Sequence, residues 1–188
     1  MDSRFGKFVS VIAAILITAG IAAAAEKTMT PLEIPMIGDV KALAAGDKAP
    51  GFETKDLTGA TFSYKPEAGN PTLLVFWSIF CEPCRDEMPL VQSMYEKYKA
   101  KGFSVVAVTL DGNLEENIRQ FVKQGKYTFT VLLDQESKDG SLVVAEKFNV
   151  PGTPTLYMVD AKGLITFAKV GRTTEAELEK AITDSFGK

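Results

Sequence analysis

The chain has 188 residues, 46% of them hydrophobic, which suits one globular domain with a buried core. Its 21 basic and 24 acidic residues give a net charge of −3 without a strongly basic stretch, so we expect no nucleic-acid partner. Because the sequence contains no histidine, it excludes Ser-His-Asp and Cys-His catalysis. Only two cysteines are present, so we predict no metal site and no bound cofactor.

The first 25 residues predict an export signal. Arg4 and Lys7 precede an apolar run from Phe8 to Ala25, and the small residues that end this run suit cleavage after Ala25. The run is also close to the minimum length of a membrane-spanning helix, so an uncleaved N-terminal anchor is the alternative. We therefore expect an exported protein, periplasmic or otherwise extracytoplasmic, that is either soluble or held by its N-terminal segment.

Residues 26–46 predict a flexible linker, because prolines and glycines interrupt them and no helical or strand period persists. The folded domain is expected over residues 47–188 and begins with a hairpin over 51–64. Strands are expected over 71–80, 102–111 and 129–134, and helices over 84–101, 113–124 and 141–149. A hairpin over 153–171 and a helix over 174–186 are expected to follow. This alternation predicts an α/β fold with a central mixed β-sheet flanked by helices.

The only two cysteines, Cys81 and Cys84, follow a predicted strand and open a predicted helix. A helix N-terminus favours negative charge, so Cys81 is placed to react as a thiolate. Pro83 needs no N–H partner in the first turn, and with Glu82, the other residue between the cysteines, it is expected to tune the redox properties of the pair. Cys84, one turn later, would resolve a mixed disulfide formed on Cys81. A purely structural disulfide is the less favoured alternative, because closing so short a loop between two cysteines contributes little stability.

Two acidic residues near the thiols are candidate tuning groups. The charge of Glu82 opposes a thiolate on Cys81, which predicts a less oxidising dithiol-disulfide couple. Glu87 lies one helical turn after Cys84 and could exchange a proton with it. Acidic residues in a first helical turn also simply complement the helix dipole, and this alternative stays open for both.

The segments FWSIFCEPCRDEMP and VPGTPTLYMVDAKG, with the order of the elements, resemble the thioredoxin fold. More narrowly, residues 47–188 resemble the exported TlpA/ResA-like thiol-disulfide oxidoreductases, which include cytochrome c maturation reductases. The N-terminal β-hairpin and the inserted helix over 113–124 fit this branch better than plain thioredoxin, and the Glu-Pro pair and Glu87 match its ResA-like pattern.

The resemblance implies that the Thr153-Pro154 peptide bond is cis, beside the thiols, and that Thr153 offers its backbone to a client chain. Phe80 stands where many relatives have tryptophan, so client contacts are expected to differ there. The lack of histidine argues against copper-delivering Sco-like relatives. The peroxiredoxin motif Pro-x-x-x-Thr-x-x-Cys is also absent.

These features predict a reductase of client protein disulfides that acts through the Cys81–Cys84 dithiol. The resemblance implies that a membrane thiol-reducing system restores the dithiol, and that the client is apocytochrome c or a copper-site protein of an oxidase. We expect a monomer. The alternatives are a disulfide-donating oxidase and a binding module whose thiols are incidental. Only slow reaction with peroxide is expected.

Overall fold

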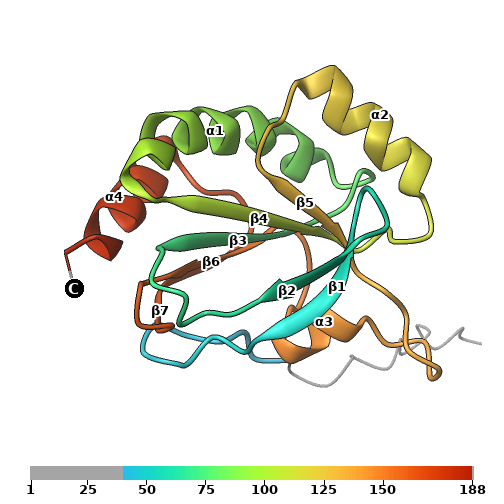
Figure 1. Cartoon of the computed structure of the whole chain (residues 1–188), viewed down its shortest axis with the longest axis horizontal. Helices are drawn as coiled ribbons and strands as arrows, with labels where there is room; N and C mark the ends of the chain where they lie inside the picture. The colour runs from blue at the N-terminus through green and yellow to red at the C-terminus, as the bar shows by residue number, and fades with distance from the viewer. Residues whose placement is uncertain (1–39, 188) are drawn as a thin grey trace, which may run out of the picture. The chain divides into compact units, whose positions relative to one another are not determined.

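A seven-stranded mixed β-sheet lies at the centre of the fold in the computed structural model, which describes residues 40–187 (Figure 1). The predicted export signal and most of the predicted linker lie outside these residues. The strand order across the sheet is β2-β1-β5-β4-β3-β6-β7. The strands are β1 (Phe52–Asp56), β2 (Thr61–Tyr64), β3 (Thr72–Trp77), β4 (Ser104–Thr109), β5 (Thr130–Leu133), β6 (Thr155–Val159) and β7 (Ile165–Val170).

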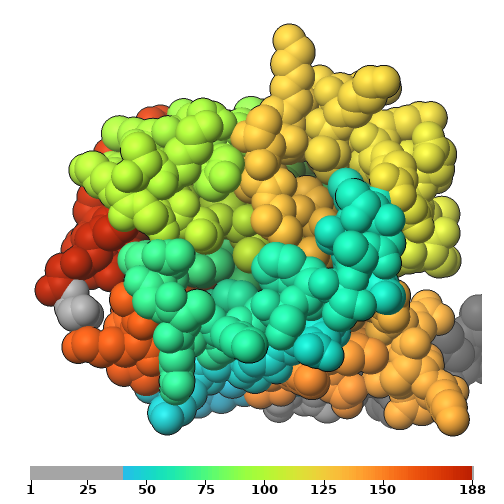
Figure 2. Space-filling model, in the orientation of Figure 1, coloured from blue at the N-terminus to red at the C-terminus, as the bar shows by residue number. Residues whose placement is uncertain are grey.

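Parallel strands form the middle of the sheet and antiparallel hairpins its two sides. β3 pairs in parallel with β4, and β4 with β5, whereas β1–β2 and β6–β7 are antiparallel hairpins. Every residue of β3 is buried, because both faces of a central strand are covered. The predicted mixed sheet and the N-terminal hairpin are therefore confirmed. In the space-filling view that hairpin lies on the visible surface below α1 and α2 (Figure 2).

Helices cover both faces of the sheet (Figure 1). One buried cluster joins the sheet to α1, α2 and α4, and a second joins its other face to α3. The helices are α1 (Glu82–Tyr98), continued by a 3-10 turn (Lys99–Lys101), α2 (Glu115–Gly125), α3 (Val143–Lys147) and α4 (Glu175–Ser185). The helix predicted over residues 84–101 thus starts two residues earlier, since Cys81 already serves as its N-cap.

The packed part of the chain begins before residue 47, the boundary that the sequence indicated. Ala42 and Leu43 pack against the α3-side cluster, and the N–H of Gly46 donates to the carbonyl of Ile165 at 2.8 Å. The last residues of the predicted linker are therefore held by the β6–β7 hairpin, a long-range contact that leaves no mark on local composition. No helix within residues 40–187 is long and apolar enough to cross a membrane.

Candidate active site

The two cysteines lie where a central strand passes into a helix. β3 ends at Trp77, and after a short loop Cys81 caps α1, its sulfur accepting the N–H of Cys84 at 3.3 Å. A disulfide joins the pair, with the Cα atoms 5.2 Å apart. Cys84 is 2% exposed and Cys81 is half-buried. Of the two sulfurs, that of Cys81 is therefore the one a partner molecule can reach.

Asp111, two residues after the end of β4, anchors the loop that carries Cys81. Its carboxylate accepts the backbone N–H of Ile79 at 2.8 Å and the hydroxyl of Ser78 at 3.1 Å. It also accepts the Thr109 hydroxyl at 3.2 Å. We did not predict this role from the sequence. The available signal was a polar residue at the carboxyl end of a strand parallel to β3, where side chains of neighbouring strands meet.

Arg85 holds the same loop from the helix side. Its guanidinium donates to the carbonyl of Ile79 at 2.8 Å, while its own N–H donates to the carbonyl of Cys81 at 3.1 Å. The N–H of Phe80 donates to the Ser78 hydroxyl at 3.1 Å. With its backbone fixed in this way, Phe80 carries its ring into solvent, 73% exposed, next to Cys81.

The Thr153-Pro154 peptide bond is cis, as the resemblance implied. Thr155 pairs with Phe76 across the antiparallel β3–β6 ladder. The start of β6 therefore lies at the end of β3, and Pro154 is at the same end of the sheet as the loop that carries Cys81. Pro154 is buried and Thr153 is half-buried. The Pro154 carbonyl accepts the N–H of Gly171 at 2.8 Å.

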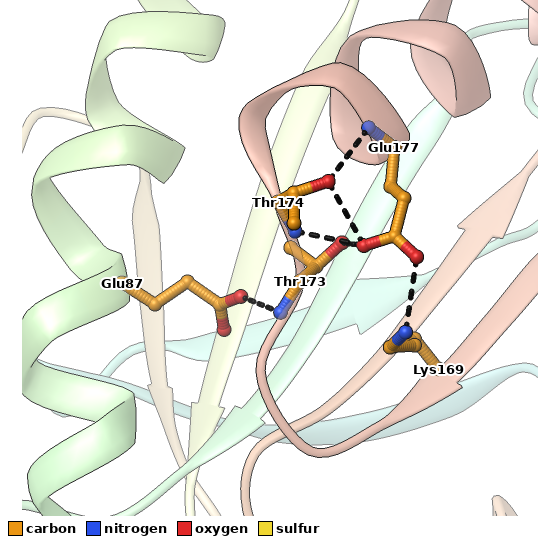
Figure 3. Close-up of polar contacts among 5 residues, drawn as sticks. All are labelled: Glu87, Lys169, Thr173, Thr174 and Glu177. Atoms are coloured by element: carbon orange, nitrogen blue, oxygen red, sulfur yellow. Dashed lines mark hydrogen bonds and ion pairs between the residues drawn. The ribbon is translucent and has the colours of Figure 1, made fainter.

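Glu87 lies on the buried face of α1 and is 7% exposed. One carboxylate oxygen accepts the N–H of Thr173 at 2.8 Å (Figure 3). The other is buried and has no hydrogen-bond partner within residues 40–187. Burial raises the pKa of Glu87, and the Thr173 N–H and the nearby charges of Arg172 and Lys169 oppose this rise. The carboxyl is thus more easily protonated than an exposed one.

The remaining predicted site residues occupy the first turn of α1. Glu82 is exposed and is the first residue of the helix, and Pro83 follows it. The structure thus brings Phe80, Cys81 and the Thr153-Pro154 bond to one end of the sheet, with Cys84 buried beneath them. The predicted tuning of the couple by Glu82 and Pro83 stays a prediction.

Comparison with known proteins finds thiol-disulfide oxidoreductases and thioredoxin-like proteins among the relatives of this chain. The model of the AhpC/TSA family matches residues 45–168. The thiol-disulfide oxidoreductase ResA of Bacillus cereus is 32% identical over 141 residues, covering 75% of this chain and 78% of that protein. The thioredoxin-like protein YneN of Bacillus subtilis is 34% identical over 139 residues, covering 73% and 78%. A crystal structure of a putative thiol:disulfide interchange protein DsbE from Chlorobium tepidum aligns with a TM-score of 0.67 at 34% identity, covering 77% of this chain and 99% of that one.

Proposed function

Since the chain belongs to the AhpC/TSA family and, within it, to the ResA-like thiol-disulfide oxidoreductases, we propose that it reduces disulfides of exported client proteins. One observation carries the proposal. A reachable sulfur on Cys81 sits at a helix N-terminus, with a buried partner sulfur on Cys84 bonded to it. This is the arrangement that an attacking and a resolving thiol require.

The reaction consists of two exchanges. The Cys81 thiolate attacks one client sulfur, forms a mixed disulfide and releases the other client sulfur as a thiolate. The Cys84 thiolate then attacks the Cys81 sulfur, closes the Cys81–Cys84 disulfide and releases the second client thiolate. The client gains two electrons and two protons, and the dithiol loses them. Because the disulfide joins the first and fourth residues of the Cys81–Cys84 motif, it can form and break without refolding of the domain.

Glu87 is the proposed proton acceptor for Cys84. On a helix, side chains three residues apart are neighbours, with Cβ atoms about 5–6 Å apart. Burial raises the pKa of Glu87 and brings its proton affinity closer to that of a thiol, which makes proton exchange between the two easier. In a protein without histidine, Glu87 is the buried titratable group nearest in sequence to Cys84 on its helix.

Client recognition is proposed at the end of the sheet where Cys81 lies. The half-buried Thr153 precedes β6 and would pair its backbone with an extended client segment. The exposed ring of Phe80 would contact apolar client side chains next to the disulfide. Apocytochrome c, or a copper-site protein of an oxidase, remains the proposed client. A membrane thiol-reducing system remains the proposed electron donor.

The direction of the reaction is tested by the reduction potential of the Cys81–Cys84 pair, measured by equilibration with a thiol buffer at neutral pH. A potential near or below about −270 mV, that of thioredoxin, is expected for a reductase. A potential near about −120 mV, that of a strong periplasmic oxidant, would contradict it and favour the disulfide-donating alternative.

Paired serine variants test the assignment of the two cysteines. Cys84→Ser is expected to accumulate a mixed disulfide with a client, because the resolving thiol is missing, whereas Cys81→Ser is expected to form none. If client maturation in cells survives the double substitution, the binding-module alternative is favoured. Rapid consumption of the thiols by peroxide would instead favour peroxide reduction.

A further inference from the structure

The loop between β7 and α4, residues 171–174, contacts two separate parts of the candidate site. The N–H of Gly171 donates to the carbonyl of Pro154 at 2.8 Å. The N–H of Thr173 donates to Glu87, and Arg172 pairs with Asp86 at 2.7 Å. Successive residues of the loop therefore contact the residue just before β6 and two residues of α1, the exposed Asp86 and the buried Glu87.

Glu177 holds this loop from the first turn of α4 (Figure 3). Thr174 is the N-cap of α4, and its hydroxyl accepts the N–H of Glu177 at 3.2 Å. In return, the Glu177 carboxylate accepts the N–H of Thr174 at 2.9 Å and its hydroxyl at 3.0 Å. The other carboxylate oxygen accepts from the ammonium of Lys169 on β7 at 3.1 Å. This capping box fixes the backbone immediately after Thr173.

We propose that Glu177 is a positioning residue of the redox site: by holding Thr174, it keeps the Thr173 N–H directed at Glu87 and so sets how readily Glu87 takes up a proton. The proposal rests on the proposed role of Glu87 in proton exchange. If the Thr173 N–H turns away, both oxygens of the buried Glu87 carboxylate lack a partner, and the neutral acid is favoured.

Several other charged or titratable groups surround Glu87. The cap and first turns of its own helix contribute Cys81, Cys84 and Asp86. The loop contributes Arg172, β7 contributes Lys169 and α4 contributes Glu177. The direct effect of removing the Glu177 charge on the pKa of Glu87 is opposite in sign to the effect of losing the Thr173 hydrogen bond. Removing the negative charge of Glu177 and freeing Lys169 would stabilise the Glu87 carboxylate, whereas losing the Thr173 hydrogen bond would destabilise it. The sign of the change therefore separates the two causes.

The experiment is an NMR titration of the Glu87 side-chain carboxyl in the oxidised full chain, in which the disulfide-bonded thiols do not titrate. In Glu177→Ala the pKa of Glu87 is expected to rise by about one unit, a tenfold change in proton affinity. Glu175→Ala removes the same charge from the same helical turn and is the matched control, expected to leave the pKa in place. Glu177→Gln is expected to keep the pKa of Glu87 close to its wild-type value, because glutamine can complete a capping box.

An unchanged or lowered pKa of Glu87 in Glu177→Ala would overturn the proposal. If that variant fails to fold, Thr174→Gly removes the hydroxyl from the same network at little cost to the helix cap, and the same rise is expected. The pKa measurement tests the positioning role of Glu177 separately from the proposed role of Glu87 in proton exchange. A rise in the pKa without any change in the pH profile of client reduction would retain the positioning role and reject proton exchange by Glu87.

Discussion

The backbone N–H of Thr173 donates to the carboxylate of Glu87 at 2.8 Å, joining residues that lie 86 positions apart in the chain. This bond satisfies one oxygen of a carboxylate that is otherwise buried and leaves the second without a partner within residues 40–187. A buried, half-satisfied carboxylate is costly to ionise. Its presence one turn from Cys84 makes Glu87 the most testable residue of the site.

Glu87→Gln is expected to change how stability depends on pH. Because the pKa of Glu87 is raised by burial from its ordinary value of 4.5, this group contributes stability that is fully present below about pH 4.5 and is lost as pH rises through its folded-state pKa. Glutamine keeps an acceptor for Thr173 but cannot ionise. In urea unfolding of the oxidised protein, the free energy of unfolding of the variant should therefore rise relative to that of the wild type as pH increases from about 4.5 through the folded-state pKa of Glu87. Above that pKa the difference between the two proteins should stay constant. A difference that does not vary with pH would show that the carboxyl is not perturbed.

Asp111→Ala is expected to destabilise the loop that carries Cys81. It removes the acceptor of the Ile79 N–H and of the Ser78 hydroxyl, at an expected cost of about 1–3 kcal/mol in the free energy of unfolding. Ser78→Ala loses the hydroxyl but keeps the Ile79 bond, so a smaller cost is expected. Urea denaturation followed by the fluorescence of Trp77, the single tryptophan, measures both. Ser78→Ala also removes the acceptor of the Phe80 N–H, so a loss in Asp111→Ala no larger than that in Ser78→Ala would contradict the expected anchoring of the loop by Asp111.

Phe80→Ala is expected to affect client reduction without affecting the fold. The ring is 73% exposed, so the free energy of unfolding should change by no more than about 0.5 kcal/mol. The rate constant for a protein client should fall several-fold, while the rate with a small disulfide reagent stays unchanged. Phe186→Ala, at the far end of α4, is the control and should leave both rates unchanged. Equal loss toward both substrates would place the effect on Cys81 rather than on client contact.

Gly112→Ala is expected to cost about 1–3 kcal/mol in the free energy of unfolding, because an added Cβ would overlap the carbonyl oxygen of Asp134. The Asp134 carboxylate caps α3 by accepting the N–H groups of Val144 and Ala145, so a shift of this residue also disturbs that helix. Gly152→Ala is the matched control, since its added Cβ would meet no heavy atom within 4 Å. Thermal unfolding compares the two, and equal melting temperatures would contradict the expectation.

Local patterns in the sequence predicted most of the elements that surround the thiols. The apolar run before Cys81 indicated a buried strand, and β3 is buried at every residue. The Cys-x-x-Cys spacing with Pro83 indicated a helix N-terminus, and Cys81 is the N-cap of α1. The predicted boundaries were less accurate. Strand ends depend on where the neighbouring strand stops, and local composition does not record that.

The sequence by itself determined the fold class, the two sulfurs that can react and the position of Glu87 one turn after them, because each depends on residue type and on short spacing along one strand or helix. Only the tertiary structure decided which distant groups complete the site. Asp111 reaches the loop before Cys81 because β4 lies parallel to β3, and Thr173 reaches Glu87 because α4 packs beside α1. Hydrogen bonds between residues tens of positions apart are set by how strands and helices pack, and this packing is a property of the whole chain rather than of any local stretch.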